Sequence, residues 1–318
     1  MPETGVAASQ LLETLLPVAA APLLAGWVAQ CRAWLGNRSG PGLLQPWRVL
    51  LKLFAKESVV ARDASFLLRF APYCVSGCMV LAASIVPMVA TGLPFAPAAD
   101  VIALVGLLAT ARVFMALAAM DAGTAFGSMG ARREMLVAGL AEPALLMVFF
   151  MPSLIVGSTS LTTIVETLAY QPFALHPSLA FAAVAFVMVL LAENARIPVD
   201  NPATHLELTM IHEAMLLEYS GRHLALMEWA HALKLMVYAG IGIALFAPWG
   251  VSPAGRWDLV PAALAALAAK LFIGGLALAV LETVSAKMRI FRAPEFLGMA
   301  FLLAVLGMLI LLLQGPPR

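Results

Sequence analysis

The sequence predicts an all-α polytopic membrane protein, and three observations support this prediction. Hydrophobic residues make up 62% of the 318 residues and charged residues only 12%, whereas about 25% of a typical soluble domain is charged. Mean hydropathy is +0.94. The apolar residues form continuous runs rather than alternating with polar ones, which predicts helices and not barrel strands. The composition excludes a disordered chain and an ordinary soluble enzyme, and a net charge of +1 gives no attraction to nucleic acid.

Eight apolar runs are long enough to cross a bilayer, which takes about 20 residues per helix. The predicted spans are residues 11–33, 66–90, 99–120, 135–156, 176–195, 228–249, 259–284 and 295–314. No internal repeat, linker or low-complexity segment divides the chain. We therefore expect a single integral membrane domain over residues 1–318.

The basic residues lie mostly in every second connection between these spans. Thirteen of the nineteen Lys and Arg residues, Arg32 at an edge included, fall in the connections at about 34–65, 121–134, 196–227 and 285–294. Cytoplasmic loops of membrane proteins carry an excess of Lys and Arg. The four connections are therefore predicted to be cytoplasmic, with both termini outside.

A short amphipathic helix is predicted in the first of these connections. Its apolar face and its basic face are made by two sets of residues at helical spacing: Trp47, Leu50, Leu51 and Phe54, and Arg48, Lys52 and Lys56. Such a helix is too short to span a bilayer and suits the membrane interface. It either rests on anionic headgroups or frames an opening or a docking surface.

The fifth connection is the most polar part of the chain. From residue 193 to residue 228 it holds six of the eighteen acids and three histidines: Glu193, Asp200, Glu207, Glu213, Glu218, Glu228, His205, His212 and His223. Asn201-Pro202 is a good helix start, and Thr204 with Glu207 is an alternative one. The apolar residues that follow predict a short helix, which ends at Ser220-Gly221.

No metal site is predicted in this chain. His212-Glu213 begins like a zinc-protease motif, but Leu216 stands where that motif needs its second histidine. The three cysteines do not form the four-thiolate pattern of an iron–sulfur cluster. The sequence also contains no phosphate-binding glycine motif and no serine-nucleophile motif.

Several charged residues lie inside predicted spans or near their ends. They are Glu142, Lys270, Arg112, Glu193, Glu228, Lys234 and Glu282. Because a charge at the bilayer centre costs about 2.5–3.5 kcal/mol, these side chains must face protein or water. They either pair to hold helices together, or they form a path of carboxylates whose proton affinity changes with conformation.

The polar connection resembles a known signature. Residues 191–200, L-A-E-N-A-R-I-P-V-D, are similar to the L-A-E-T-N-R-x-P-F-D segment of subunit 1 of respiratory complex I. The segments 218–221, E-Y-S-G, and 227–230, M-E-W-A, are similar to further segments of that family. Upstream, residues 40–46, G-P-G-L-L-Q-P, followed by Lys52 and Lys56-Glu57, resemble it too. Glu142 falls where the family has a glutamate.

One departure points to a branch of this family. Between Glu207 and Glu218 there are about three more residues than complex I leads us to expect. The runs 196–213, 221–226 and 287–295 resemble instead the membrane subunit of group 4 [NiFe]-hydrogenases, of the formate hydrogenlyase subunit 4 and hydrogenase-4 component C type. The chain is therefore similar to the hydrogenase branch of the complex I subunit 1 superfamily.

The resemblance implies a non-catalytic subunit that binds no cofactor itself. It would anchor a cytoplasmic arm of hydrogenase large and small subunits and a ferredoxin-like iron–sulfur subunit, which hold the iron–sulfur clusters and the [NiFe] centre. It would join this arm to antiporter-like membrane subunits in a prokaryotic cytoplasmic membrane. This branch is not expected to need a quinone, and its acidic loop differs from that of complex I.

Two sets of residues are expected to carry out proton coupling and docking of the arm. The proton-path or coupling set is Glu142, Glu193, Asp200, Glu207, Glu213, Glu218, Glu228, Glu282, Arg196 and Lys234. The set expected to dock the arm is Gln45, Arg48, Lys52, Lys56, Arg132, Arg133, Arg222, Lys287, Arg289 and Arg292. The alternatives are a quinone-binding subunit of a complex I type dehydrogenase and a stand-alone ion transporter, although the inverted repeat common in transporters is not seen.

Overall fold

The computed structural model describes residues 3–61, 64–170, 177–200, 210–253 and 256–314. Eight helices are long: α1 (Glu3–Leu35), α3 (Phe66–Ile85), α4 (Val101–Asp121), α5 (Ala125–Val156), α7 (Pro177–Glu193), α10 (Gly221–Phe246), α11 (Val260–Val284) and α12 (Ala293–Gln314). Three other helices in the described residues are short: α2 (Gln45–Phe54), α6 (Leu161–Tyr170) and α9 (His212–Leu216). The same residues also form three 3-10 turns: η1 (Ala96–Ala98), η2 (Trp257–Leu259) and η3 (Ile290–Arg292). The described residues form no β-strand, so the all-α prediction is confirmed.

Each long helix corresponds to one predicted span. Seven of them in the described part of the chain are long and apolar enough to cross a membrane. The eighth, α7, matches the fifth predicted span but has only 17 residues, short of the roughly 20 that a perpendicular crossing takes. The protein is a multi-pass membrane protein.

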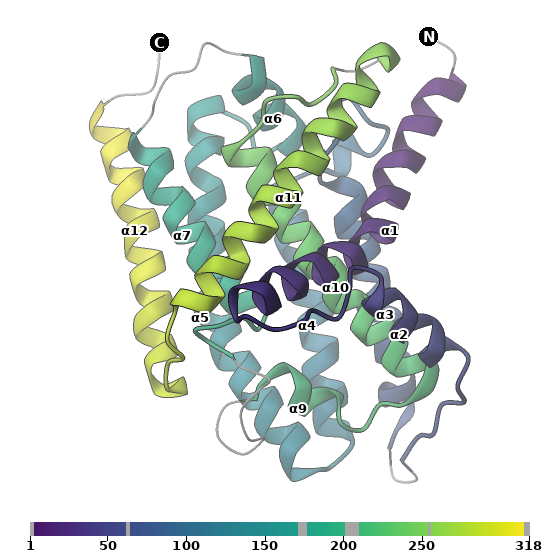
Figure 1. Cartoon of the computed structure of the whole chain (residues 1–318). Helices are drawn as coiled ribbons and strands as arrows, with labels where there is room; N and C mark the ends of the chain where they lie inside the picture. Colours follow the sequence, from purple (N-terminus) through teal and green to yellow (C-terminus); the bar gives the residue numbers. More distant parts are fainter. Residues whose placement is uncertain (1–2, 62–63, 171–176, 201–209, 254–255, 315–318) are drawn as a thin grey trace.

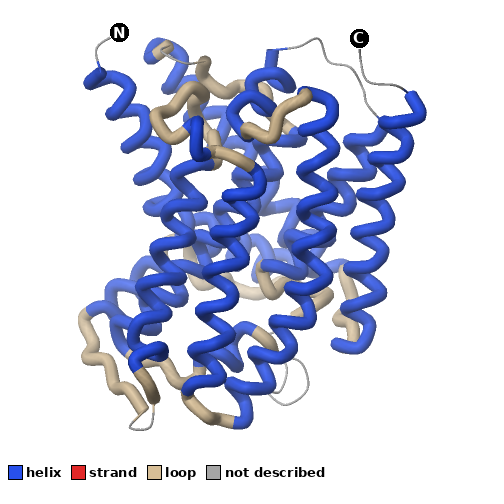
Figure 2. The backbone as a smooth tube through the Cα atoms, turned by 180° about the vertical axis from the view of Figure 1, so that it is seen from behind, coloured by secondary structure: helices blue, strands red, loops and turns tan. Residues whose placement is uncertain are grey.

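The long helices run side by side and form one bundle (Figure 1). In this bundle α10 packs against α1, α2, α3 and α7, and it is the most buried of the seven spans. Helix α12 packs against α5 and α7, and α11 packs mainly against α1. Figure 2 shows the opposite side of the bundle, with loops gathered at its two ends. Helix α10 is thus the central element on which buried side chains from several helices can converge.

The two ends of the bundle differ in what they carry. The start of α1, the end of α12 and α6 lie at one end, and α2 and α9 lie toward the other (Figure 1). The four connections rich in Lys and Arg are also at the end with α2 and α9. We call this second end the basic end.

Helix α2 confirms the predicted amphipathic helix of the first connection. Leu50 is buried, Arg48 and Lys52 are exposed, and the Trp47 ring N–H donates a hydrogen bond to the carbonyl of Ala19 on α1 at 3.2 Å. Gly26 allows a close approach of α1 to this region, because a Cβ there would meet the carbonyl of Leu43. Helix α2 is therefore held against α1 and α10.

The second base-rich connection is shorter than predicted. Residues 121–134 were expected to form a loop, but α5 begins at Ala125, where the Thr124 hydroxyl accepts a hydrogen bond from Gly127 N–H at 3.3 Å. Helix α9 covers this early part of α5, since a Cβ at Gly130 would lie 3.0 Å from that of Ala214. A capping side chain and tertiary packing together extend the helix beyond its apolar run.

The second span ends earlier than predicted. Helix α3 stops at Ile85 rather than near residue 90, because Val86 precedes Pro87 and is extended. The Glu13 carboxylate on α1 then accepts backbone N–H groups of the next segment. These donors belong to Met88, Val89 and Ala90, the last two at 3.0 and 3.3 Å. Donors bound by a carboxylate are not available for a helical ladder.

The fifth connection also differs from its prediction. Ser220-Gly221 does not end a helix but begins α10, with Gly221 at φ +51°. A side chain at Gly221 would meet the carbonyl of Glu57, so the junction requires glycine both for its φ and for its space. The predicted helix start at Asn201-Pro202, with Thr204, His205 and Glu207, lies outside the described residues.

Candidate functional site

A cluster of charged side chains is buried between four helices. Arg112 on α4 binds Glu193 on α7 through Nη2 and Glu142 on α5 through Nη1, both at 2.5 Å. Its Nε lies 3.7 Å from Glu134 on α5, and Lys234 on α10 lies 3.0 Å from Glu193. We call these five residues the charge cluster. It connects the predicted path residues Glu142, Glu193 and Lys234.

The charge cluster contains more acid than base. The side chains of Arg112 and Glu193 are 3% and 2% exposed, and only Glu142 has substantial access, at 34%. Three carboxylates, Glu134, Glu142 and Glu193, stand against two cations, Arg112 and Lys234, which leaves a formal charge of −1. Because an uncompensated buried charge is costly, this excess is the charge that one bound proton would neutralise.

A polar stripe runs along α10 from the basic end toward the charge cluster. Glu228, His231, Lys234 and Tyr238 are spaced by three, three and four residues, which places them on one face of the helix. Lys234 and Tyr238 are buried, whereas Glu228 is exposed. The stripe therefore passes from an accessible carboxylate to the buried cluster.

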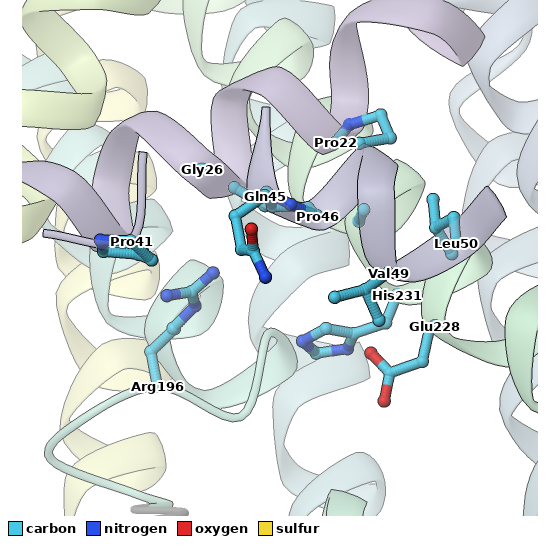
Figure 3. A pocket seen from close by; sticks show the side chains of 13 residues that line it. Pro22, Gly26, Pro41, Gln45, Pro46, Val49, Leu50, Arg196, Glu228 and His231 are labelled. Atoms are coloured by element: carbon cyan, nitrogen blue, oxygen red, sulfur yellow. The ribbon is translucent and has the colours of Figure 1, made fainter. Parts of the chain in front are cut away.

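The accessible end of this stripe lines a cavity of about 270 Å³ between α1, α2 and α10. Pro22 and Gly26 on α1 and Val49 and Leu50 on α2 form an apolar wall. Arg196, Glu228, His231 and Gln45 contribute the polar groups. Figure 3 shows the side chains of these four residues directed toward one shared space.

A second group of ion pairs lies next to this cavity. Glu282 on α11, whose side chain is fully buried, pairs with Arg196 at 3.1 Å and with Arg32 on α1 at 3.4 Å. Here two cations face one carboxylate, which gives a formal charge of +1. The guanidinium of Arg196 therefore serves both this ion pair and the cavity wall.

The segment around α9 is tied to α10 through two histidines. The rings of His212 on α9 and His231 on α10 stack with centroids 4.0 Å apart. The Asp200 carboxylate accepts hydrogen bonds from the backbone N–H of Ile211 at 3.1 Å and of His212 at 3.2 Å. Burial, together with the nearby cations Lys234 and Arg196, lowers the pKa of His212 to about 3, so the packed ring is neutral.

Glu213 follows His212 and stands near the exposed surface of α9. Burial and the neighbouring Asp200 carboxylate raise the pKa of Glu213 above its ordinary range. It is thus a carboxyl that holds its proton more firmly than a solvated glutamate. Among the described residues, no group of three or more His, Cys, Asp and Glu side chains is placed to hold a metal ion.

A comparison with models of protein families identifies the family of this chain. The family model described as NADH dehydrogenase matches residues 9–313, nearly the whole chain. The chain belongs to the NADH dehydrogenase family. The predicted resemblance to complex I subunit 1 is confirmed.

Relatives of this NADH dehydrogenase family member include a formate hydrogenlyase subunit and a hydrogenase-4 component. It is 33% identical to formate hydrogenlyase subunit 4 of Escherichia coli K12 over 302 residues, which cover 95% of this chain and 97% of that protein. It is 36% identical to hydrogenase-4 component C of the same organism, over 76% of this chain and 75% of that protein. Identity to an NADH-quinone oxidoreductase subunit of Solibacter usitatus is 28%, over 76% of this chain and 64% of that protein.

A solved structure supports the fold of this family member. A chain in the structure of the membrane-bound sulfane sulfur reductase, an archaeal respiratory membrane complex, superposes with a TM-score of 0.80. The match covers 96% of this chain and 99% of that chain at 22% sequence identity. At that identity the similarity concerns the fold alone.

The structure groups most of the predicted path residues of this family member and leaves others apart. Glu142, Glu193 and Lys234 meet at Arg112, Glu228 joins Arg196 at the cavity, and Glu282 binds Arg196. Glu218 has no ion pair among the described residues. Glu207 lies outside the described residues.

The predicted docking residues lie on the elements of the basic end. Gln45, Arg48 and Lys52 are on α2, Lys56 follows it, and Arg222 is in the first turn of α10. Arg132 and Arg133 are on the early part of α5, not in a loop as predicted. Arg133 Nη1 donates to the carbonyl of Met210 at 3.2 Å. Lys287, Arg289 and Arg292 lie between α11 and α12 or at η3.

The predicted path omits several residues that are important in the structure. Arg112 is the centre of the charge cluster, although the sequence indicates it only as a charge inside an apolar run and the predicted path does not include it. Glu134 stands next to two basic residues in the sequence, and this pattern predicts a charge on the protein surface. The stacking of His212 on His231 depends on tertiary structure, because 19 positions separate them.

Proposed function

We propose that this protein is the membrane-anchoring and proton-path subunit of a membrane-bound group 4 [NiFe]-hydrogenase complex, of the formate hydrogenlyase or hydrogenase-4 type. It would link a cytoplasmic iron–sulfur and [NiFe] arm to antiporter-like membrane subunits. The 33% identity to formate hydrogenlyase subunit 4 over 95% of the chain supports this assignment. The iron–sulfur and [NiFe] chemistry belongs in this proposal to the partner subunits.

One observation carries the proton-path part of the proposal: the charge cluster holds three carboxylates and two cations. A buried site with one excess negative charge favours proton uptake, and cations that move closer favour release. Arg112 touches all three carboxylates, so a shift of α4 against α5 or α7 changes their charge balance. Such a site can couple a conformational change to a proton.

The route into the cluster follows the stripe on α10. Glu228 and His231 line the cavity at the basic end, and Lys234 reaches Glu193 within the cluster. Consecutive members of the stripe are three or four residues apart, a spacing that side chains and bridging waters can cover. The His212 and His231 stack joins this route to the α9 segment, the part of the chain that would face the arm.

The docking part of the proposal rests on the basic end. Exposed bases lie on α2, on the early part of α5 and between α11 and α12, all at the end of the bundle that carries α9. The hydrogenase large and small subunits and the ferredoxin-like subunit would bind there. This arrangement requires the basic end to be cytoplasmic and both termini to be outside.

Purification of the tagged full-length protein in a mild detergent from its own cells tests this function. We expect iron- and nickel-containing partners to copurify in defined ratio, together with hydrogen-dependent activity. Recovery of the chain alone would contradict the proposal and would favour a stand-alone ion transporter.

A second candidate function is that of a quinone-binding subunit of a complex I type dehydrogenase, and the cavity favours it. Its apolar wall on α1 and α2 and its polar groups, His231, Glu228 and Arg196, would suit a ring with polar edges. If a quinone binds there, His231 and Gln45 would hold its oxygens, and the quinone would supply an electron acceptor. Activity of the purified complex that requires added quinone would favour this candidate, and activity without quinone would favour the hydrogenase assignment.

A further inference from the structure

A second cavity, of about 420 Å³, lies at the basic end away from the charge cluster. It is lined by Ser58, Val60, Arg69, Tyr73, Arg222 and His223. These residues come from the segment after α2, the start of α3 and the first turn of α10. We call it the arginine cavity.

The walls of the arginine cavity are fixed by several hydrogen bonds. Val59 N–H donates to the Ser220 hydroxyl at 2.8 Å, and that hydroxyl donates to the Val59 carbonyl at 2.9 Å. Arg222 N–H donates to the Ser58 hydroxyl at 3.0 Å. The ring of Tyr73 lies edge-on to the ring of His223, with centroids 5.8 Å apart. The cavity is therefore preformed rather than an opening between loose loops.

Two arginines give the arginine cavity its positive charge. Within the described residues, neither Arg69 nor Arg222 has a carboxylate within ion-pair distance, whereas Arg112 and Arg196 both do. A guanidinium group presents two parallel N–H donors that match the oxygens of a phosphate. Two such groups beside a histidine, a tyrosine hydroxyl and a serine form a set of donors suited to an anion.

The neighbourhood of the cavity places it at the level of lipid headgroups. On the start of α3, Phe66, Phe70 and Tyr73 are 74%, 40% and 57% exposed. Exposed aromatic side chains at the end of a membrane span are typical of the membrane–water interface. A phosphate carried by a lipid in that leaflet can reach the cavity from the side.

We propose that the arginine cavity binds the phosphate of an anionic phospholipid, held between Arg69 and Arg222. The acyl chains would lie along the exposed aromatic side chains of α3. Since the segment after α2 forms one wall, a bound lipid would also fix that segment against the start of α10. This site is separate from the proposed proton path, and its loss would leave the charge cluster intact.

Lipid binding to the purified, delipidated complex tests the proposal. The probes are phosphatidylglycerol, phosphatidylcholine with the same acyl chains, and inorganic phosphate alone, with bound lipid counted by native mass spectrometry. We expect phosphatidylglycerol to bind about tenfold more tightly than phosphatidylcholine, the equivalent of ~1.4 kcal/mol. We expect inorganic phosphate neither to bind nor to displace it.

The variant Arg69→Gln/Arg222→Gln should lose this preference for phosphatidylglycerol. The control Arg38→Gln removes an exposed base from the same end, outside both the cavity and the set expected to dock the arm, and should keep it. If the glutamine variant fails to assemble, Arg69→Lys/Arg222→Lys, which keeps the charge and loses the planar fork, should bind more weakly than the unchanged protein. Equal binding of the two lipids, an unaffected arginine variant, or tight binding of inorganic phosphate alone would overturn the proposal.

Discussion

Arg112 on α4 and Lys234 on α10 approach the same carboxylate oxygen, Oε2 of Glu193, at 2.5 and 3.0 Å. Two cations from different helices thus share one acceptor from a third, α7. Neither cation can move without changing the electrostatic environment of Glu193. The following predictions start from this relationship.

Replacement of Glu193 by glutamine should uncouple the complex. The Glu193→Gln side chain keeps the shape and can still accept hydrogen bonds, but it cannot bind and release a proton. We expect proton movement to fall by at least about tenfold while the complex assembles, because proton-transfer groups contribute about 10²–10⁴-fold to rates. The measurement is proton uptake in proteoliposomes, compared with redox activity in detergent.

The Glu142→Gln variant should show the same loss, since Glu142 binds the other terminal nitrogen of Arg112. Glu166→Gln is the matched control, because Glu166 lies on α6 at the opposite end of the bundle. Full coupling in both the Glu193 and the Glu142 variants would remove the charge cluster from the proton path.

Loss of Arg112 should destabilise the protein more than loss of any single carboxylate. Arg112→Met leaves Glu134, Glu142 and Glu193 with only Lys234 as compensation, and breaking a buried ion pair costs about 3–5 kcal/mol. Thermal unfolding in detergent should show a clear drop in midpoint. Adding Glu193→Gln to Arg112→Met should recover part of it, and an additive further loss would contradict the shared-charge explanation.

Acidification should loosen the α9 segment. The folded pKa of His212, about 3, is below the ordinary value of about 6.5, so the released segment binds a proton more readily than the packed one. The packing is therefore complete above about pH 6.5 and weakens as the pH falls toward 3. Hydrogen exchange of residues 212–219, corrected for intrinsic rates, should show lower protection at pH 5 than at pH 7.

The His212→Gln variant provides the control for this pH dependence. Its segment lacks the His212 ring and should show a smaller loss of protection between pH 7 and pH 5, because Glu213 still titrates. Equal protection at pH 5 and pH 7 in the unchanged protein would mean that the stack with His231 tolerates the proton.

Replacement of Gly221 by alanine should weaken the junction between α10 and the segment after α2. Gly221 has φ +51°, and its added methyl group would meet the carbonyl of Glu57. A strained left-handed residue costs about 1–3 kcal/mol, and the midpoint of thermal unfolding should fall accordingly. Gly106→Ala on α4, with no atom within 4 Å of the new methyl group, should leave the midpoint unchanged or raise it slightly.

The orientation can be tested with single cysteines in a variant that lacks Cys31, Cys74 and Cys78. Lys56→Cys, at the basic end, should react with a membrane-impermeant thiol reagent only when the reagent has access to the cytoplasmic side of the membrane. Glu166→Cys, at the other end, should react in intact cells with a permeabilised outer membrane. The reverse pattern would place both termini in the cytoplasm.

The bundle could be predicted from the sequence because lipid leaves few alternatives to apolar helices. Helix α2 was also predictable, because its apolar and basic residues recur at helical spacing on two opposite faces. The ends of helices were harder to predict where a side chain distant in the sequence helps to determine them. Glu13 on α1 binds the backbone of the segment after α3, and α9 packs on the early part of α5, so both limits depend in part on residues distant in the sequence.

The sequence predicted several residues of the candidate site, but it did not predict which of them form ion pairs with one another. Glu142, Glu193 and Lys234 stand out as charges in apolar runs, and the structure brings them together. Which cation each carboxylate binds depends on how α4, α5, α7 and α10 pack. Arg112 therefore emerges as the centre only once the helices are in place.

Helix α5 reaches well beyond the bilayer, because its 32 residues span ~48 Å at 1.5 Å per residue against ~30 Å of hydrocarbon. It touches Met210 through Arg133 at the basic end and carries Glu134 and Glu142 farther along. Pro143 follows Glu142 directly and removes a backbone donor from the ladder there. Helix α5 therefore forms a continuous connection between the surface of the basic end and two carboxylates that share one guanidinium.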